Sequence, residues 1–352
     1  MKIFDYVRPA TVPDAVAAAA EPGSAYLAAG TNLLDLMKGG VLRPDRLIDV
    51  TRLPGLDRLE RLADGGVRIG ALMRNADLAH DADFARAYPA VAEALLSGAS
   101  AQLRNAATVG GNLMQRTRCS YFYDVASACN RREPGAGCDA LQGENRLHAV
   151  LGWSKHCIAT HPSDFCVPLV ALDAVVEIEG KNGRREIALE DLHRLPGDTP
   201  ERESALETGD LIVALRLPGD ASSFAAHARY LKLRERTSFA FAVVSAAAAL
   251  DLDGGTIRSA RLALGGVAAK PWRPRAAEEA LAGADADEKA FRKAAEAALA
   301  DARPSGDNAF KIELAKRIVV RALALAAAGT PERLPALPAS PFSSVPGALQ
   351  HA

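Results

Sequence analysis

The sequence lacks any excess of charge and any long apolar run. Its 352 residues contain 42 Lys and Arg against 43 Asp and Glu, for a formal net charge of -1. This balance gives no reason to expect binding to nucleic acid. No run of about 18 apolar residues is present, so we expect no insertion into a membrane. The first residues contain neither an uninterrupted apolar segment nor a twin-arginine motif, so we expect no export signal of the chain's own.

Cysteine is also scarce, with only five residues, which is an odd number and far below the density of a disulfide scaffold. Four of them, Cys119, Cys129, Cys138 and Cys157, fall in one stretch without helical or strand periodicity. Thiolate ligands to a metal are therefore the favoured interpretation, and two disulfides with one free thiol are the alternative. Nine, eight and eighteen residues separate these cysteines. These spacings match neither ferredoxins nor zinc ribbons, so iron–sulfur and zinc both stay open.

The fifth cysteine, Cys166, lies in an apolar segment that predicts a buried helix, where a free cysteine behaves as a small hydrophobic residue. His156 and His161 flank the cysteine segment and are possible alternative ligands, because imidazole can replace a thiolate. Ordinary surface or hydrogen-bonding roles are the simpler interpretation of both histidines.

The pattern of apolar residues predicts an α+β protein of two or three domains. The first half is predicted to contain helices at 13–20, 32–38, 76–80 and 90–96 and strands at 25–29, 46–50 and 67–71. The second half is predicted to contain strands at 174–179, 186–189, 211–217, 241–252 and 256–265 and helices at 165–172, 275–281, 288–299 and 309–328. The tail beyond Thr330 is rich in proline and predicts an extended arm.

Two turns of small residues are candidates for a nucleotide site. The first, LAAGTNLL (27–34), joins a predicted strand to a helix, and its backbone N–H groups can form a concavity for phosphate. The second, Thr108 to Asn112, contains a glycine pair that permits positive φ and close approach to a ligand. Each alone is equally consistent with an ordinary turn. Together with Pro162-Ser163-Asp164 before a helix, they suit a dinucleotide.

These segments also carry a family resemblance. In order, LAAGTNLL (27–34), IGAL (69–72), ATVGGN (107–112) and PSDF (162–165) resemble the FAD-binding, or medium, subunit of the xanthine dehydrogenase and molybdenum hydroxylase family. The resemblance covers roughly residues 1 to 330. The family usually has Gly-Gly-Thr-Asp where this chain has Ala29-Gly30-Thr31-Asn32. Because the phosphate contacts are made by the backbone, this change leaves the expectation of FAD binding intact.

The resemblance implies a vanillyl-alcohol-oxidase-type, or PCMH-type, FAD-binding fold of two α/β subdomains followed by a C-terminal α+β domain like that of the CO dehydrogenase flavoprotein. The expected units are 1–58 for the first subdomain, 59–220 for the second, 221–330 for the C-terminal domain and 331–352 for the extended tail. The residues implied to contact FAD are Leu27, Ala28, Ala29, Gly30, Thr31, Asn32, Leu33, Leu34, Thr108, Gly111, Asn112, Asp164, Ile212 and Lys232. Ile212 would pack on the flavin ring and Lys232 would reach the ring from the C-terminal domain.

An insertion at about 115–160 separates the two motifs that most family members connect by a short segment. It resembles the insertion in the FAD subunit of periplasmic aldehyde oxidoreductases, and more distantly that of 4-hydroxybenzoyl-CoA reductase. The resemblance implies a [4Fe-4S] cluster held by Cys119, Cys129, Cys138 and Cys157.

The implied function is electron transfer within a molybdenum-dependent aldehyde oxidoreductase. Electrons would come from a molybdenum-cofactor large subunit and a [2Fe-2S] small subunit of a heterotrimer, and would pass through FAD to an external acceptor. No residue is expected to act on the aldehyde. The resemblance implies a periplasmic location reached through a partner's signal, with a cytoplasmic location as the alternative. The medium subunit of another molybdenum hydroxylase, a stand-alone FAD oxidase and a zinc-stapled binding protein stay open as alternative functions.

Overall fold

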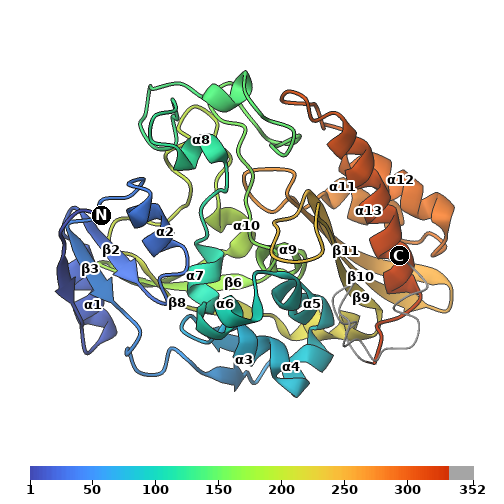
Figure 1. The fold of residues 1–352 in the computed structure, drawn as a ribbon. Helices are drawn as coiled ribbons and strands as arrows, with labels where there is room; N and C mark the ends of the chain where they lie inside the picture. The colour runs from blue at the N-terminus through green and yellow to red at the C-terminus, as the bar shows by residue number, and fades with distance from the viewer. Residues whose placement is uncertain (333–352) are drawn as a thin grey trace.

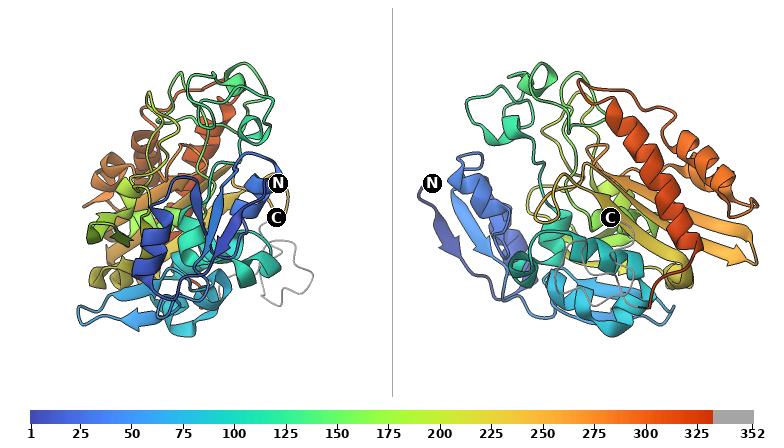
Figure 2. Two further views of the ribbon diagram at one scale, coloured as in Figure 1. Left: turned by 90° about the vertical axis from the view of Figure 1, so that its left-hand side faces the viewer. Right: turned by 45° about the vertical axis from the view of Figure 1, so that its right-hand side comes forward.

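The computed structural model describes residues 1–332, and the tail predicted at 331–352 lies almost wholly outside the described residues. Three sheets form the framework of the described part (Figure 1). The first belongs to the N-terminal segment, the second lies centrally, and the third carries the C-terminal helices (Figure 2). Each sheet falls within one of the three units expected from the sequence, and the exact domain boundaries stay a prediction.

The N-terminal sheet is parallel. Its strands β1 (Asp5–Val7), β2 (Ser24–Leu27) and β3 (Arg46–Asp49) pair in the order β1-β3-β2. The connections contain α1 (Val12–Ala19) and α2 (Leu33–Lys38). Thr11 caps α1 by accepting a hydrogen bond from the Asp14 backbone N–H at 3.2 Å, and Pro13 lies in its first turn. The end of β2 and the start of α2 therefore stand next to each other at one edge of the sheet.

Asp49 ends β3 and anchors the loops around this sheet. Its buried carboxylate accepts hydrogen bonds from Arg8 Nε at 2.8 Å, from the Thr51 backbone N–H at 2.9 Å and from the Tyr6 hydroxyl. Burial alone would raise the pKa of Asp49, but the hydrogen bonds from Thr51, Tyr6 and Arg8 outweigh it and lower the pKa to about 2.

The central sheet is antiparallel and has the strand order β4-β5-β8-β6-β7. Its strands are β4 (Leu59–Arg61), β5 (Val67–Gly70), β6 (Val175–Gly180), β7 (Gly183–Ala188) and β8 (Leu211–Leu217). The helices associated with it are α3 (Asn75–His80), α4 (Ala82–Ala87), α5 (Pro89–Ser97), α6 (Ala101–Ala106), α7 (Val109–Leu113), α9 (Cys166–Ala171) and α10 (Leu189–Leu192). Their apolar side chains form the largest hydrophobic core, in which Ile69, Phe165 and Leu215 are buried.

The C-terminal sheet has the strand order β11-β10-β9 and is antiparallel. It consists of β9 (Ala228–Leu233), β10 (Val244–Asp253) and β11 (Thr256–Gly265), and the 3₁₀ segment η2 (Gly219–His227) leads into it. The helices α11 (Arg275–Leu281), α12 (Glu288–Ala298) and α13 (Phe310–Ala327) follow it. Because Ala246 and Ala248, which share a core with α13, have small side chains, α13 can pack closely on β10.

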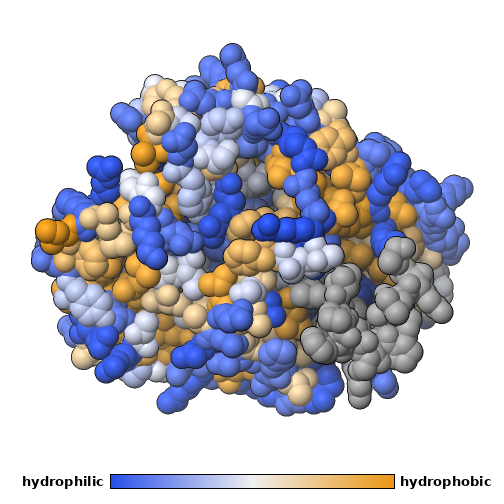
Figure 3. Space-filling view, viewed as in Figure 1, coloured by the Kyte–Doolittle hydropathy of each residue, from blue (hydrophilic) through white to orange (hydrophobic). Residues whose placement is uncertain are grey.

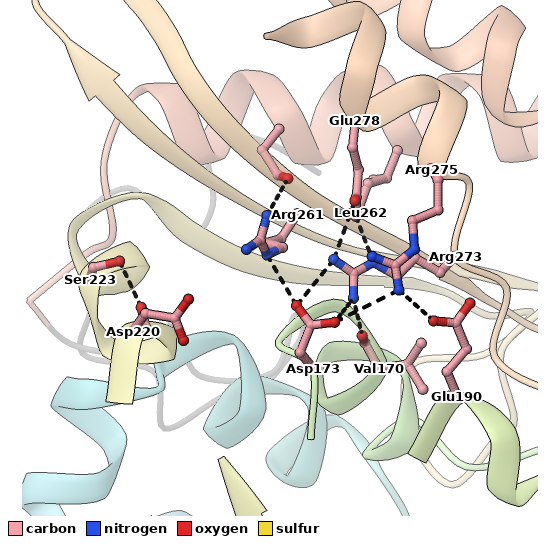
Figure 4. Close-up of polar contacts among 11 residues, drawn as sticks. Val170, Asp173, Glu190, Asp220, Ser223, Arg261, Leu262, Arg273, Arg275 and Glu278 are labelled. Carbon is pink, nitrogen blue, oxygen red and sulfur yellow. Dashed lines mark hydrogen bonds and ion pairs between the residues drawn. The ribbon is translucent and has the colours of Figure 1, made fainter. Parts of the chain in front are cut away.

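An ion-pair network joins the C-terminal domain to α9 (Figure 4). The buried guanidinium of Arg273 donates hydrogen bonds to the Val170 carbonyl at 3.0 Å, to Glu278 at 2.9 Å and to Asp173. The Glu278 carboxylate also accepts from the Leu262 backbone N–H at 2.8 Å. This network holds β11 and α11 against the central domain.

The insertion at about 115–160 forms an irregular layer at the top of Figure 1, and its regular elements are α8 (Ser120–Tyr123) and the 3₁₀ turn η1 (Asp139–Leu141). On one side it packs against α2, where Phe122 and Cys129 share a small core with Leu36. On the other side it contacts the start of α13, because Lys311 Nζ donates to the Leu147 and His148 carbonyls at 2.8 Å. The insertion therefore bridges the first and third units.

The predicted helices and strands were largely confirmed, with ends shifted by a few residues and β7 beginning three residues before the predicted strand. One interpretation was wrong: Thr108 to Asn112 is not a turn with positive φ but includes the short helix α7, and neither of its glycines has positive φ. The strands β1, β4 and β9 and the short helices α4, α6, α8 and α10 were not predicted individually. None of the helices in the described residues is long and apolar enough to cross a membrane.

Candidate functional site

A cavity of about 1110 Å³ lies where the three units meet. Figure 3 shows a hollow near the centre of this face, beneath the insertion. Nine of the residues predicted to bind the cofactor line the cavity: Ala29, Gly30, Thr31, Asn32, Leu34, Gly111, Asn112, Asp164 and Lys232. The structure therefore brings together segments that are more than 200 residues apart in the sequence.

The loop between β2 and α2 provides one wall of the cavity. Gly30 has a φ of +73°, and its carbonyl accepts the hydrogen bond from Leu34 N at 3.0 Å that begins the helix. Leu36 N likewise donates to the Asn32 carbonyl at 3.3 Å, and the other N–H groups of the loop and of the first turn of α2 are the ones that a phosphate could meet. Asn32 Oδ1 accepts from the Arg116 backbone N–H at 3.1 Å, whereas its buried Nδ2 has no hydrogen-bond partner among the described residues.

The helix α7 provides a second wall. Thr108 caps it, because Thr108 Oγ1 accepts from the Gly111 backbone N–H at 3.3 Å. The glycine pair is needed for close packing: a Cβ on Gly110 would lie 3.0 Å from Ala71 Cβ. At the end of α7, Asn112 Oδ1 accepts from the Ser163 hydroxyl at 2.7 Å. This bond joins the second and third nucleotide motifs of the sequence.

A buried ion pair connects the C-terminal sheet to the cavity. Lys232 Nζ lies 2.7 Å from Asp164 Oδ2, and the two side chains are only 4% and 6% exposed. The Tyr230 hydroxyl donates to Asp164 Oδ1 at 2.5 Å, and Lys232 Nζ also donates to the Ser97 carbonyl at 3.1 Å. Burial and the neighbouring Asp164 carboxylate raise the pKa of Tyr230 well above its ordinary value. The pair fixes β9 against α5 and α9 at the cavity wall.

Five residues of the predicted set do not line the cavity: Leu27, Ala28, Leu33, Thr108 and Ile212. Thr108 acts as the cap of α7, and Ala28 packs in the N-terminal core. Ile212 is 6% exposed and belongs to the central core. The continuous apolar run of β8 could not indicate from the sequence which face of the strand each residue would take.

Several residues that the sequence did not single out also line the cavity and have polar atoms without partners. Among the described residues, Asn75 Oδ1, Arg118 Nε and His148 Nδ1 are buried and unpaired. The Arg118 guanidinium stacks over the Phe241 ring at 4.9 Å. No local motif marks these positions. These residues are identified only by the fold, which brings all of them to the wall of the cavity.

These features fit FAD. Buried polar groups normally have hydrogen-bond partners, so several unpaired groups around one cavity indicate a polar ligand. The volume is sufficient for a dinucleotide, since pockets of about 300–1,000 Å³ accommodate drug-sized ligands. The β2–α2 loop is suited to the diphosphate, and apolar side chains such as Leu103 and Phe241 are suited to a flat ring.

A second, smaller cavity contains all four cysteines of the insertion. Cys119, Cys129, Cys138 and Cys157 line it together, and Cys119 also lines the large cavity. All five cysteines of the chain are free, so the alternative of two disulfides is wrong. Cys129 and Cys138 face each other in an antiparallel bridge. The fold thus gathers four thiols that the sequence spreads over 39 residues.

The loop around the cysteines is also held by its own side chains. Asn130 Oδ1 accepts from the Gly135 and Gly137 backbone N–H groups at 3.1 and 2.9 Å, and Asn130 Nδ2 donates to the His156 carbonyl at 3.1 Å. Hydrogen bonds within the loop therefore contribute to its conformation in addition to any bound group. Arg131 is almost fully buried and pairs with Glu203 at 2.9 Å.

Burial raises the pKa of the Cys119 thiol to about 12 and also raises that of Cys138. Backbone N–H groups oppose this effect: those of Phe122 and Tyr121 stabilise the thiolate of Cys119, and those of Ala140, Leu141 and Ile158 do so for Cys138. Arg131 also hydrogen-bonds to Cys157, and His148 Nε2 lies 3.2 Å from Cys119 Sγ. The surroundings thus favour anionic sulfur once a metal displaces the protons.

The separation of the sulfurs restricts the kind of metal. Among residues 1–332, the only three potential ligands whose donor atoms all lie within 4.8 Å of one another are His161, Cys166 and His193. No three of the four insertion cysteines therefore come that close. His156, a candidate alternative ligand, lies beside the cysteine cavity with its Nε2 3.4 Å from Asp198 Oδ1. Cys166 is fully buried in the central core, as predicted.

Comparisons with known proteins agree with this arrangement. Residues 2–220 match the FAD binding domain in molybdopterin dehydrogenase, and residues 229–326 match the CO dehydrogenase flavoprotein C-terminal domain. The chain is 50% identical to the aldehyde oxidoreductase FAD-binding subunit PaoB of Escherichia coli, over 93% of this chain and 99% of that protein. It is 28% identical to the carbon monoxide dehydrogenase medium chain of Hydrogenophaga pseudoflava, over 91% of this chain and 96% of that protein.

Solved structures show the same fold. A chain of carbon monoxide dehydrogenase from Hydrogenophaga pseudoflava superposes with a TM-score of 0.72 at 28% identity, covering 92% of this chain and 97% of that chain. A chain of reconstituted CO dehydrogenase from Oligotropha carboxidovorans gives a TM-score of 0.73 at 25% identity, covering 93% of this chain and 99% of that chain. The predicted FAD-binding fold followed by a CO-dehydrogenase-flavoprotein-like C-terminal domain is confirmed.

Proposed function

The chain belongs to the family of FAD-binding subunits of molybdenum hydroxylases, and from this premise we propose that it is the FAD and [4Fe-4S] subunit of an aldehyde oxidoreductase. The observation that carries the proposal is the shared wall of the two cavities. Cys119 lines both the flavin-sized cavity and the cavity of the four cysteines. The two redox groups would therefore be neighbours within one chain.

When bound, FAD supplies the exchange of electrons singly or in pairs, and the protein supplies binding, orientation and access. The N–H groups at the start of α2 would hold the diphosphate, and Gly30 allows the close approach that this requires. Asn112 and Asp164 would position the rest of the cofactor from the opposite side. Lys232 is held by Asp164, so it would act on the cofactor mainly by fixing this carboxylate.

Three observations support a metal–sulfur site in the insertion, and the third favours a [4Fe-4S] cluster over a zinc ion. The four thiols converge on one cavity without forming disulfides. Backbone N–H groups point at the sulfurs of Cys119 and Cys138, as is favourable for cluster sulfur. The sulfurs are also spaced more widely than in a mononuclear site, where a zinc–sulfur bond of about 2.3 Å places neighbouring sulfurs about 3.8 Å apart.

We also propose the partners implied by the family, namely a large subunit with the molybdenum cofactor and a small [2Fe-2S] subunit in a heterotrimer. The substrate class, an aldehyde, comes from the similarity to the Escherichia coli protein, which is named an aldehyde oxidoreductase subunit. The aldehyde would react on the large subunit, and an external acceptor would receive the electrons. This chain contributes no group to the substrate chemistry in the proposal.

The proposal can be tested by co-expressing the three subunits and measuring FAD, iron and acid-labile sulfide in the purified complex. Cys138→Ala is expected to lower the iron content by roughly four atoms per complex, because a cubane missing one ligand is destabilised. Cys166→Ala is the matched control and is expected to retain this iron. An unchanged iron content in Cys138→Ala would contradict the cluster.

The function is tested separately by adding an aldehyde without oxygen. The flavin band should bleach in the complex and not in the isolated chain. Bleaching of the isolated chain by aldehyde would instead indicate a stand-alone oxidase. Failure of the flavin to bleach in a complex that contains molybdenum, iron and FAD would refute the aldehyde assignment.

For the location, we propose the periplasm, reached as a folded complex through the signal of a partner. Cell fractionation with and without that partner's signal tests this proposal. The chain should move from the periplasmic to the cytoplasmic fraction when the signal is removed. A cytoplasmic chain in both cases would support the alternative location.

A further inference from the structure

Behind the flavin cavity lies a buried group of three potential ligands that the proposed function does not use. His161 precedes Pro162 at the cavity wall, Cys166 is the first residue of α9, and His193 follows α10. The three residues are 9%, 0% and 6% exposed. Their donor atoms all lie within 4.8 Å of one another, although the residues come from three separate segments.

The hydrogen bond of His193 determines the tautomer of its imidazole ring. His193 Nε2 lies 2.7 Å from the Leu113 carbonyl oxygen. A carbonyl can only accept, so Nε2 carries the hydrogen and Nδ1 carries a free lone pair. This Nδ1 is buried and has no hydrogen-bond partner in the described residues. Metal-binding histidines in proteins show the same arrangement, with one ring nitrogen donating to a carbonyl and the other left for the metal.

His161 provides a second unpaired nitrogen. Its Nε2 is buried without a partner among residues 1–332, and its ring lies 4.2 Å from the ring of His193, at an angle of 55°. Two buried ring nitrogens without hydrogen-bond partners are unusual in a folded protein and indicate a missing partner.

Cys166 completes the set. A metal ion would displace the proton of this thiol and bind the thiolate, as in other thiolate sites. Four charged groups lie near the three ligands: Arg131 near His161, Lys270 and Glu203 near His193, and Asp164 near Cys166.

We propose that His161, Cys166 and His193 form a second metal site that binds one ion of the zinc type. Two imidazole nitrogens and one thiolate are ligands that Zn²⁺ prefers, and a fourth position would be filled by a small ligand such as water. Zinc–nitrogen and zinc–sulfur bonds of about 2.0 and 2.3 Å require donor atoms separated by roughly 3.3–3.8 Å, which small side-chain rotations within the 4.8 Å limit can reach. The site is separate from the four-cysteine cavity.

The test uses the full chain in its complex, stripped with a chelator and then dialysed against a buffer of fixed free Zn²⁺. The wild type is expected to retain one zinc per chain, with mixed nitrogen and sulfur ligands in the zinc-edge X-ray absorption spectrum. Cys166→Ser and His193→Gln should each weaken zinc binding by roughly 100-fold, the upper scale for the loss of supporting groups at metal sites. Their iron content should stay unchanged.

Cys138→Ala is the complementary control, because this variant should lose iron and retain this zinc, whereas the other two variants should lose zinc and retain iron. An all-sulfur ligand shell would place the zinc in the four-cysteine cavity and overturn the proposal. No retained zinc in the wild type, or full retention in both variants, would overturn it as well. If one variant folds poorly, the other decides, and thermal unfolding with and without Zn²⁺ shows whether the ion stabilises the wild type more than the variants.

Discussion

Replacement of Gly30 by alanine tests whether the β2–α2 loop holds FAD. Gly30 has a φ of +73°, a region that costs a residue with a side chain about 1–2 kcal/mol. A Cβ at this position would also lie 2.7 Å from Leu34 Cδ1. Relief of this contact requires rotation of the Leu34 side chain, which lines the cavity, or a shift of the start of α2, where Leu34 N donates to Gly30 O. The N–H groups that face the phosphate would move with it.

Gly40→Ala is the matched control. Gly40 has the same φ of +73°, but a Cβ there would meet nothing closer than an Arg43 guanidinium nitrogen at 3.5 Å. Gly40 does not line the cavity. Both variants should therefore lose about 1–2 kcal/mol of stability in urea denaturation, since both carry the backbone strain. Only Gly30→Ala should also weaken FAD binding, by about tenfold or more, which corresponds to about 1.4 kcal/mol.

The assay is titration of the apoprotein with FAD, followed by quenching of flavin fluorescence. Equal FAD affinities in Gly30→Ala and Gly40→Ala would show that the loop does not contact the diphosphate. The reasoning on strain would fail if Gly40→Ala were as stable as the wild type.

Two further perturbations address buried charges. Lys232→Met should lower the free energy of unfolding by about 3–5 kcal/mol and reduce the flavin content, because it leaves the Asp164 carboxylate buried without its cation. The double variant Lys232→Met with Asp164→Asn should recover part of this loss of stability. Equal losses in the single and double variants would contradict the pairing. Asp49 has a folded-state pKa of about 2 against an ordinary 3.8, so its contribution to stability is present above pH 3.8 and is lost as the pH falls through 2. Acid denaturation should therefore be less steep in Asp49→Asn over this interval, and identical profiles would refute the assignment.

The sequence predicted the β2–α2 loop where the signal is local. A turn of small residues between a strand and a helix is visible in a short window, and in the structure Gly30 of this turn has positive φ. Such features depend on neighbours within a few residues, so spacing alone identifies them.

The sequence failed where a position depends on distant partners. The glycine pair of α7 was interpreted as a turn because glycine permits positive φ. In the structure a cap from Thr108 and tight packing against Ala71 favour a helix instead. Ile212 was assigned to the flavin by its place in the family pattern. In the structure it lies on β8 at the centre of the sheet and is buried with the central core, and its contact with the flavin stays a prediction. Asn75 and His148 carry no signal that could be read without the fold.

The two groups of potential metal ligands also show that the sequence alone could not identify a metal site or its metal. The insertion cysteines were conspicuous in sequence, yet their spacing could not distinguish a cluster from zinc. Their separation in space favours a cluster, because one ion needs sulfurs closer together than these four lie. The histidines at 161 and 193 are 32 residues apart and suggested no pair. Their donor atoms and that of Cys166 lie within 4.8 Å of one another, which small side-chain rotations can bring to the spacing of a single ion. The proposed cluster site and this proposed site are therefore expected to take different metals in one chain.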